Sequence, residues 1–355
     1  MTARALQQRT TPREPQRSEA AFIAELERAL STSLSDGELD RVALPLVSAR
    51  SAKRARARLA FLLGTAFEAD PNRVLDIALA VELVHAASLL HDDVLDEATS
   101  RRGLPTANHL HGEVVAVLAG DLVLTRAMTR VLTLGTDAVA SALDTIAEMS
   151  RAVAYEAQSR GRVLAQADWV AMAEGKTGAL FGVVARLIGL AVRSPRELAP
   201  YERALRLLGV AFQATDDLTD FVLSGETPLV DLRDGNPSLV ITLACQADPS
   251  LAAELTAAWR NRPLRDELLA MSRRVLATEA TVEVERFILQ TIERAKGELE
   301  LELRHPARGP AAARLLGWAS SLVEQVRVAR NGPLGDSQLR ALASWRGPVN
   351  EESQP

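Results

Sequence analysis

Residues 203–223, RALRLLGVAFQATDDLTDFVL, indicate the fold class of this 355-residue chain more clearly than any other stretch. Their apolar residues recur at intervals of three and four positions, which is the period of one face of an α-helix. The same period runs through residues 114–134, 179–192 and 284–303. Aromatic residues make up only 4% of the chain, and convincing alternating strand patterns are absent. We therefore predict an all-α protein.

Prolines and glycines mark the ends of the predicted helices. Asp70-Pro71 combines an N-cap residue with proline at the first helical position, and predicts a helix that runs to about Asp96. No proline occurs between residues 106 and 194, where the helical period continues. Residues 224–237 form the most irregular internal stretch, which is typical of a functional loop.

The composition is that of one globular protein. No linker divides the chain, so we expect a single helical domain over residues 19–330. Residues 1–18 are polar and Arg-rich without the apolar core of a secretory signal, and we expect a disordered tail there. For residues 331–355 we expect a short helix and a tail.

Charge and cysteine content exclude several classes of protein. The net charge of −5 argues against a nucleic-acid partner. Cys245 is the only cysteine, which excludes a disulfide framework within the chain and fits a cytoplasmic location. No run of 18 uncharged apolar residues occurs, so we expect no stable membrane anchor.

Two aspartate clusters carry the strongest chemical signal, DDVLD at residues 92–96 and DDLTD at residues 216–220. The first and last aspartates of each cluster are four positions apart, so on a helix they share one face, about 6 Å apart along the axis. Their mutual repulsion calls for a counter-ion, and oxygen ligands without His or Cys favour Mg²⁺. A solvated acidic face is the alternative. The candidate metal ligands are Asp92, Asp93, Asp96, Asp216, Asp217 and Asp220.

Basic residues accompany the clusters. Arg101 and Arg102 follow the first cluster, and Lys53 and Arg56 lie upstream near a predicted helix start. Guanidinium groups bind phosphate oxygens in a bidentate manner, so we expect these residues to hold diphosphate. The alternative for residues 53–56 is a solvated charged face.

The run HAASLLHDDVLDEATSRRGLPT at residues 85–106, together with GVAFQATDDLTDF at residues 209–221, resembles the trans-isoprenyl diphosphate synthase family. The resemblance covers residues 20–330 and includes a GKRxR-like segment at residues 52–56 and LAGD at residues 118–121. It implies a single-domain helical bundle of the isoprenoid synthase type, with the active site in a central cavity. It also implies a homodimer.

The resemblance further implies a role for each matching residue. The first aspartate cluster would bind two Mg²⁺ ions on an allylic diphosphate, and the second cluster a third. The isopentenyl diphosphate pocket would consist of Lys53, Arg56, His85 and Arg102. The groups around the allylic diphosphate and the developing cation would be Arg101, Lys176, Thr177 and Gln213, the last three being catalytic. Lys53 and Lys176 are two of only three lysines in the chain, which favours a chemical role for both.

The implied reaction is a Mg²⁺-dependent condensation of isopentenyl diphosphate with an allylic diphosphate to an all-trans polyprenyl diphosphate. Ala87 and Ser88 lie one helical turn before the first cluster, where large aromatic residues in this family stop chain growth. Their small side chains predict products of twenty carbons or more. In the alternative, Ala87 only serves close helix packing, and Leu83, Val84 or another helix limits the product.

The chain departs from the family pattern after the second cluster. Glu226 and Asn236 stand where the family has lysines, and Ser51-Ala52 replaces the two glycines before Lys53. Each lost lysine weakens a charge-assisted contact with diphosphate.

Two other functions stay open. A class I terpene cyclase shares the metal-dependent ionisation, but it usually lacks both the second aspartate cluster and an isopentenyl pocket. A non-catalytic subunit of a heteromeric synthase would usually have a broken first cluster, and here both clusters are whole.

Overall fold

The computed structural model describes residues 18–35, 37–49, 52–101, 103–222, 229–261 and 265–331. The predictions for Ser51, Arg102 and Glu226, and those for the tails at residues 1–17 and 332–355, lie outside the described residues.

The described residues are almost entirely helical, which confirms the predicted all-α class. The helices are α1 (Glu19–Ser33), α2 (Glu38–Val47), α3 (Ala55–Ala66), α4 (Pro71–Leu95), α5 (Ala107–His111), α6 (Glu113–Leu132), α7 (Thr136–Ser159), α8 (Gln166–Ala173), the π-helical turn η1 (Glu174–Gly178), α9 (Ala179–Ala191), α10 (Pro195–Val222), α11 (Val230–Asp234), α12 (Leu239–Ala247), α13 (Pro249–Arg260), α14 (Arg265–Ala277), α15 (Ala280–Glu298), α16 (Glu300–Leu303) and α17 (Gly309–Asn331).

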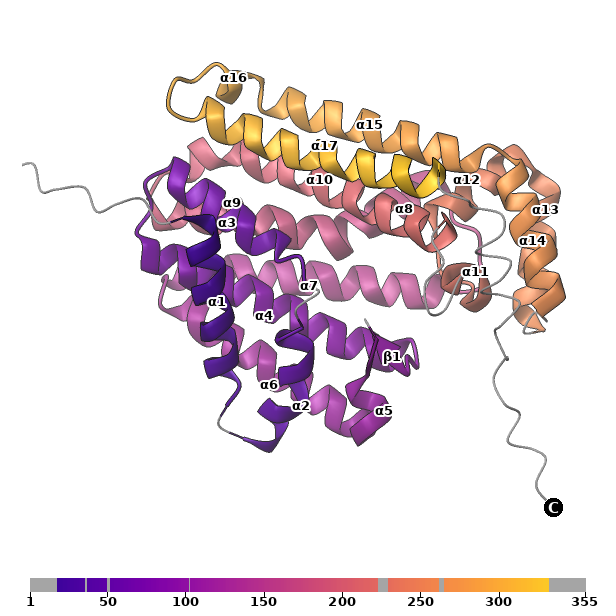
Figure 1. The fold of residues 1–355 in the computed structure, drawn as a ribbon, viewed down its shortest axis with the longest axis horizontal. Helices are drawn as coiled ribbons and strands as arrows, with labels where there is room; N and C mark the ends of the chain where they lie inside the picture. The colour runs from indigo at the N-terminus through magenta and orange to yellow at the C-terminus, as the bar shows by residue number, and fades with distance from the viewer. Residues whose placement is uncertain are drawn as a thin grey trace, which may run out of the picture.

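The two aspartate clusters lie on helices in the middle of the bundle. Figure 1 shows α4, α7, α9 and α10 running along the long axis, with α15 and α17 on one side and α1, α2 and α6 on the other. The clusters end α4 and α10, at the end of the bundle where Figure 1 labels β1 and α11. This arrangement places both clusters at the same end of the central helices.

Helix α4 begins and ends where the sequence predicts. The carboxylate of Asp70 accepts hydrogen bonds from the backbone N–H groups of Asn72 at 2.9 Å and Arg73 at 3.1 Å, and Pro71 occupies the first helical position. By length and composition α4 could cross a membrane, but 67% of its most apolar window is buried inside the molecule. It is the core helix of this bundle.

A π-helical turn interrupts the chain between α8 and α9, and the sequence analysis did not predict it. Here η1 packs backbone to backbone on α10. A Cβ atom on Gly209 would lie 2.6 Å from Gly178 Cα, and one on Gly178 would lie 2.8 Å from the carbonyl oxygen of Arg206. Only glycines allow this approach, which brings Thr177 of η1 against α10. Single π-helical turns are frequent at functional sites.

A two-stranded hairpin follows the first aspartate cluster, which the sequence patterns also did not predict. Strands β1 (Ser100–Arg101) and β2 (Leu104–Pro105) pair antiparallel, with Arg101 opposite Leu104. The turn between them uses Gly103 at φ 76°, a conformation that favours glycine. Strands of two residues are too short to leave an alternating pattern.

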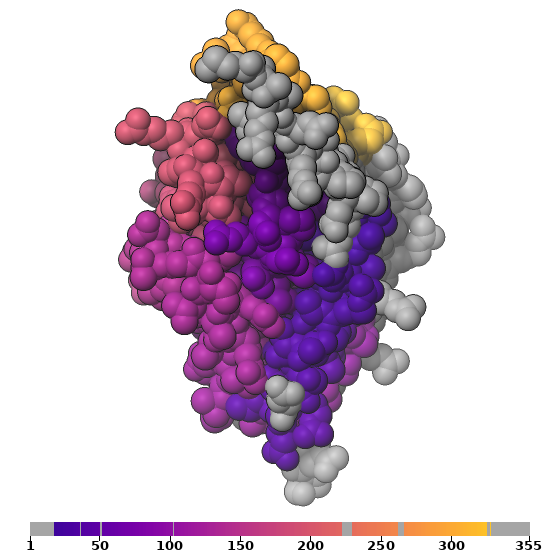
Figure 2. Space-filling view, turned by 90° about the vertical axis from the view of Figure 1, so that its left-hand side faces the viewer, coloured from indigo at the N-terminus to yellow at the C-terminus, as the bar shows by residue number. Residues whose placement is uncertain are grey.

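The N-terminal and C-terminal helices belong to one helical body. The Oε2 atom of Glu19 in α1 accepts a hydrogen bond from Arg314 of α17 at 3.1 Å, and α17 also packs on α3 and α10. Figure 2 shows this end of the molecule, with the orange and yellow C-terminal helices at the top and the indigo N-terminal residues at the lower right. Buried apolar side chains from Phe22 to Val323 form one core.

Candidate active site

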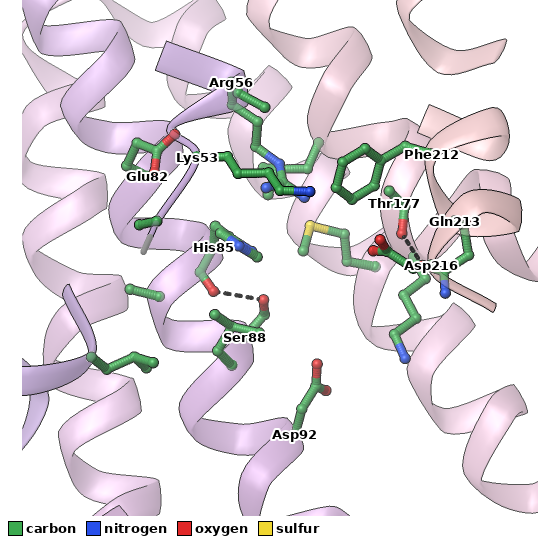
Figure 3. Close-up of a pocket in the computed structure, with 18 of the residues that line it drawn as sticks. Lys53, Arg56, Glu82, His85, Ser88, Asp92, Thr177, Phe212, Gln213 and Asp216 are labelled. Atoms are coloured by element: carbon green, nitrogen blue, oxygen red, sulfur yellow. Dashed lines mark hydrogen bonds between the residues drawn. The ribbon is translucent and has the colours of Figure 1, made fainter. Parts of the chain in front are cut away.

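A cavity of about 450 Å³ lies between α3, α4, α7, η1 and α10. Figure 3 shows Lys53, Arg56 and His85 on one side of it and Thr177, Gln213 and Asp216 facing them from the other. Asp92 points into the space between the two groups. The predicted site residues that line this main cavity are Lys53, Arg56, His85, Ser88, Asp92, Asp96, Arg101, Lys176, Thr177, Gln213 and Asp216.

A second cavity of about 250 Å³ adjoins the main one and shares Asp96, Lys176, Gln213 and Asp216 with it. We call it the acidic cavity, because most of its lining residues that carry charge are carboxylates. Its other described lining residues are Glu156, Arg160, Asp217, Asp220, Val230, Asp231, Asn236 and Pro237. The two cavities therefore join the first aspartate cluster to the second.

Burial makes the carboxylates on these walls harder to ionise than usual. Burial raises the pKa of Asp92 to about 6, although Lys176 acts in the opposite direction. Burial likewise raises the pKa of Asp220 to about 6, and burial beside Asp220 raises that of Asp231 well above its usual value. A divalent cation would stabilise their ionised forms, and oxygen-only ligands suit Mg²⁺. The donor atoms therefore fit the metal that the sequence predicts, although within the described residues no three of these groups stand close enough together to form a metal site.

The second aspartate of each cluster accepts hydrogen bonds from other residues of the protein. The Oδ1 atom of Asp93 accepts a hydrogen bond from Arg101 Nε at 2.6 Å, and Asp93 lines neither cavity. Asp217 is buried and accepts hydrogen bonds from Trp169 at 3.0 Å and from the backbone N–H of Leu239 at 2.8 Å. The structure therefore brings Asp92, Asp96, Asp216, Asp217 and Asp220 to the cavity walls but does not bring Asp93 with them. The predicted metal roles of the two middle aspartates stay predictions.

A chain of hydrogen bonds fixes the catalytic candidates on η1 and α10. The hydroxyl of Thr177 donates to Gln213 Oε1 at 2.8 Å, and Gln213 Nε2 donates to Asp217 Oδ1 at 3.0 Å. The side-chain amide of Gln213 thus has a defined orientation beside the main cavity. These bonds depend on the glycine contact that brings η1 against α10.

Lys176 stays protonated at this site. Its ammonium group forms an ion pair with Glu156. Burial lowers the pKa of Lys176, but the carboxylates of Glu156 and Asp92 outweigh burial and hold that pKa above its usual range. Lys176 is therefore a permanent cation between the two clusters.

The buried carboxylate of Glu82 accepts hydrogen bonds from the segment that carries Lys53 and Arg56 at the basic end of the main cavity. Ala57 donates its backbone N–H to Glu82 Oε1 at 3.2 Å, and Arg54 Nη1 donates to Glu82 Oε2 at 3.4 Å. Arg54 adopts φ 50°, a left-handed conformation that is strained for a residue with a side chain. Glu82 thus holds the turn between Lys53 and Arg56 in one conformation.

Arg56 and Lys53 both lie near aromatic rings. The guanidinium of Arg56 lies 4.8 Å from the ring centroid of Phe181, and Lys53 Nζ lies 6.0 Å from that of Phe212. Burial lowers the pKa of Arg56 to about 10, and Glu82 partly offsets this effect. Arg56 remains charged at neutral pH and faces the cavity.

Ala87 and Ser88 have different surroundings in the structure. Ser88 lines the main cavity, and its hydroxyl donates to the carbonyl oxygen of His85 at 2.9 Å (Figure 3). Ala87 is buried in the core and does not line the cavity. Successive helical residues point about 100° apart, so only one of the two faces the cavity. The chain-length role of both residues stays a prediction.

Sequence reasoning missed several residues of the acidic cavity. Glu156 and Arg160 come from the end of α7, and Asp231 comes from α11. Glu156 and Arg160 are single charges in otherwise ordinary helical sequence, which carries no signal. Asp231 does lie in the irregular stretch that the sequence analysis singled out, and its position there is the one signal that pointed to it.

Known proteins resemble this chain in sequence and in structure. The sequence model of the family described as polyprenyl synthetase matches residues 39–273. The nonaprenyl diphosphate synthase of Mycobacterium tuberculosis is 32% identical over 254 residues, which cover 69% of this chain and 75% of that protein. The octaprenyl diphosphate synthase of Escherichia coli is 36% identical over 202 residues, which cover 53% of this chain and 60% of that protein.

Among solved structures, heptaprenyl diphosphate synthase from Staphylococcus aureus superposes with a TM-score of 0.79 at 21% identity, covering 87% of this chain and 99% of that chain. At this identity the similarity concerns the fold, and it confirms the predicted bundle of the isoprenoid synthase type. The family match spans both aspartate clusters and the basic residues before them. The chain belongs to the polyprenyl synthetase family.

Proposed function

We propose that this protein is a Mg²⁺-dependent trans-prenyltransferase. It condenses isopentenyl diphosphate with an allylic diphosphate and forms an all-trans polyprenyl diphosphate. One observation carries the proposal: Asp92 and Asp96, at the end of α4, share a cavity with Asp216 on α10, and Lys53, Arg56 and His85 line the same cavity. Such a cavity offers one site for a metal-bound diphosphate and another for a second anionic substrate.

The metal would be held by the first and last aspartate of each cluster, all of which reach the cavity walls. These are Asp92 of α4 with Asp96 just after it, and Asp216 and Asp220 of α10. Bound Mg²⁺, three ions by the family resemblance, supplies stabilisation of the negative charge that develops on the leaving diphosphate.

The chain's own residues position both substrates. Lys176 and Arg101 line the cavity beside the first cluster and bind the allylic diphosphate. Breaking its C–O bond leaves an allylic cation, which the carbonyl of Gln213 and the hydroxyl of Thr177 face. Lys53, Arg56 and His85 hold isopentenyl diphosphate so that its double bond forms the new C–C bond. The released diphosphate then accepts the proton that the isopentenyl unit loses after the new bond has formed.

Water must be excluded, because it would capture the cation. Apolar side chains from α7, α9 and α10 complete the cavity lining, among them Met149, Leu180 and Phe212. With the small side chain of Ser88 on the α4 wall, this lining supports a product of twenty carbons or more.

We further propose that the protein acts as a homodimer in the cytoplasm. Helix α6 buries one face against α4, whereas large apolar side chains on its other face are exposed to solvent. Val114 is 75% exposed, Leu118 49% and Leu132 64%, and Leu110 of α5 is 59% exposed. A row of this kind is typical of a protein–protein interface. The cytoplasmic location rests on the sequence composition alone.

Product analysis tests the function directly. The protein is incubated with Mg²⁺, labelled isopentenyl diphosphate and each of a series of allylic diphosphates, and the products are separated by chain length. We expect elongated diphosphates that disappear in the Asp92→Asn variant. Cyclic hydrocarbons formed from the allylic substrate alone would instead identify a terpene cyclase, and the absence of any product would favour a non-catalytic subunit.

A further inference from the structure

Arg160 follows the last residue of α7 and lies between the two aspartate clusters. Its Nη1 donates to the carbonyl oxygen of Leu95 at 2.9 Å, and its Nη2 forms an ion pair with Asp96. Its Nε–H is buried and has no hydrogen-bond partner. Among the described residues that line the acidic cavity, Arg160 and Lys176 are the cations. Lys176 is already paired with Glu156.

The turn that carries Arg160 is attached to the segment after the second cluster. Gly161 donates its backbone N–H to the carbonyl oxygen of Gly235 at 2.9 Å, and both glycines have positive φ angles, 73° and 71°. A Cβ atom on Gly235 would lie 2.9 Å from Gly161 N. Trp259 holds the same segment by donating its indole N–H to the carbonyl oxygen of Leu232 at 2.7 Å. Arg160 therefore has a fixed position relative to residue 236.

Residue 236 is where the family pattern has a lysine and this chain has asparagine. Asn236 lines the acidic cavity, and its backbone N–H donates to the carbonyl oxygen of Asp231 at 3.0 Å. Its side chain is neutral, so it brings no charge to a phosphate. Arg160 lines the same cavity from the other side of the glycine contact. The missing positive charge is thus present in this cavity, but it comes from the end of α7.

We propose that Arg160 binds the diphosphate of the allylic substrate in place of the lysine that Asn236 has replaced; this inference rests on the proposed function. Arg160 is the counter-ion of Asp96 while that carboxylate binds no metal. Once Asp96 serves as a metal ligand, Nη2 is released, and together with the unpartnered Nε it forms a two-donor edge for phosphate oxygens. Arg160 is a substrate-binding residue in this scheme.

Titration calorimetry without turnover tests the proposal through two affinities that change in opposite directions. In Arg160→Gln, the affinity for Mg²⁺ alone should rise a few-fold, because Asp96 loses its competing partner. The affinity for inorganic diphosphate at saturating Mg²⁺ should fall about tenfold, because a charge-assisted contact is lost. A purely structural role would weaken both. An unchanged diphosphate affinity would overturn the proposal.

Two further variants keep the test decisive. Adding Asn236→Lys to Arg160→Gln should restore the diphosphate affinity to within about threefold of the original. Failure of this rescue in a protein that keeps its helical circular dichroism would overturn the replacement of one cation by the other. Arg162→Gln is the matched control, since Arg162 is exposed on the same turn and lines neither cavity.

The outcome is separable from that of the proposed function. Diphosphate binding is measured without any allylic or isopentenyl substrate, so loss of affinity in Arg160→Gln would support the inference even if elongation failed. Conversely, normal elongation together with unchanged diphosphate affinity in Arg160→Gln would overturn this inference alone.

Discussion

The indole of Trp169 donates its N–H to the Oδ2 atom of Asp217 at 3.0 Å, in a pair that is almost fully buried. Gln213 and the backbone of Leu239 donate to the same carboxylate. Burial raises the pKa of Asp217 to about 7 in spite of these bonds. The second aspartate cluster therefore contains a carboxylate held by protein donors next to Asp216, which lines both cavities.

This contrast predicts different effects for two adjacent aspartates. Asp217→Ala leaves three donors without their acceptor, and should lower the free energy of unfolding by about 3 kcal/mol. Asp216→Ala should abolish turnover and change the free energy of unfolding by less than about 1 kcal/mol. Urea denaturation followed by circular dichroism measures both. Equal losses of stability in the two variants would show that Asp217 has no special structural role.

Asp92 should destabilise the metal-free protein at neutral pH. Its pKa is raised to about 6 by burial, so the folded state binds this proton more tightly than the unfolded state does. The stability that the protonated form contributes is fully present below about pH 4 and is lost as the pH rises through 6. Asp92→Asn should therefore raise the free energy of unfolding by about 2 kcal/mol at pH 7.5.

The same substitution should have little effect on stability at pH 3.5, where Asp92 is largely protonated in both the folded and the unfolded protein. Denaturation at the two pH values without Mg²⁺ checks this difference. A variant that is less stable than the original at pH 7.5 would contradict the assigned direction of the pKa shift.

Glu82 lines the main cavity and should position its basic end through Arg54 and Ala57. Glu82→Gln keeps an oxygen for the N–H of Ala57 but removes the charge that faces Arg54 and Arg56. We expect the KM for isopentenyl diphosphate to rise about tenfold and kcat to fall less than threefold, since a looser turn weakens binding. Steady-state kinetics with each substrate varied separately measures this split.

Asp76→Asn is the control for Glu82→Gln, because it also neutralises a carboxylate beside an arginine. The pair of Asp76 with Arg130 is 3.9 Å long, partly exposed and away from both cavities. It should leave both constants unchanged. A fall in kcat with a constant KM in Glu82→Gln would contradict the positioning role.

Ser88, and not Ala87, should control product length. A phenylalanine at residue 88 enters the main cavity, so Ser88→Phe should shorten the products. Ala87→Phe forces a large side chain into the packed core, and should cost about 1 to 3 kcal/mol of stability. Product separation and thermal unfolding of both variants distinguish the two effects. Shorter products from Ala87→Phe at unchanged stability would place the end of the product tunnel beside residue 87.

Cys245 should be unreactive in the folded protein. Its side chain is 7% exposed, and burial raises the pKa of the thiol to about 11, so the thiolate is scarce at neutral pH. Alkylation by iodoacetamide at pH 8 should therefore require denaturant, and mass spectrometry of the native and denatured protein measures it. Rapid labelling of the native protein would show that α12, which carries Cys245, opens locally.

The sequence predicts the fold and the main ligands of the site because each depends on local spacing. The helical period in residues 203–223 and the N-cap at Asp70 act within a few residues, and the structure agrees with both. The first and last aspartates of each cluster share a helical face for the same reason. Family motifs add the pairing of the clusters, which no local pattern contains.

The remaining features depend on contacts between distant residues. Arg160 meets Asp96 across 64 positions of sequence, and Trp169 meets Asp217 across 48. The sequence around these four residues contains no pattern that indicates either contact. Asp93 and Asp217 differ from their neighbouring aspartates only through the donors that the fold brings to them. Local sequence does not distinguish them from the aspartates beside them.

The contact between Gly178 and Gly209 has a consequence for how far this site can vary. A single methyl group at either position would have to push η1 and α10 apart, and the 2.8 Å hydrogen bond from Thr177 to Gln213 would be the first to open. The spacing between η1 and α10 beside the main cavity therefore depends on the absence of side chains at Gly178 and Gly209. Substitutions that change the product are expected at other residues lining the cavity, since a side chain at either glycine would disrupt this contact.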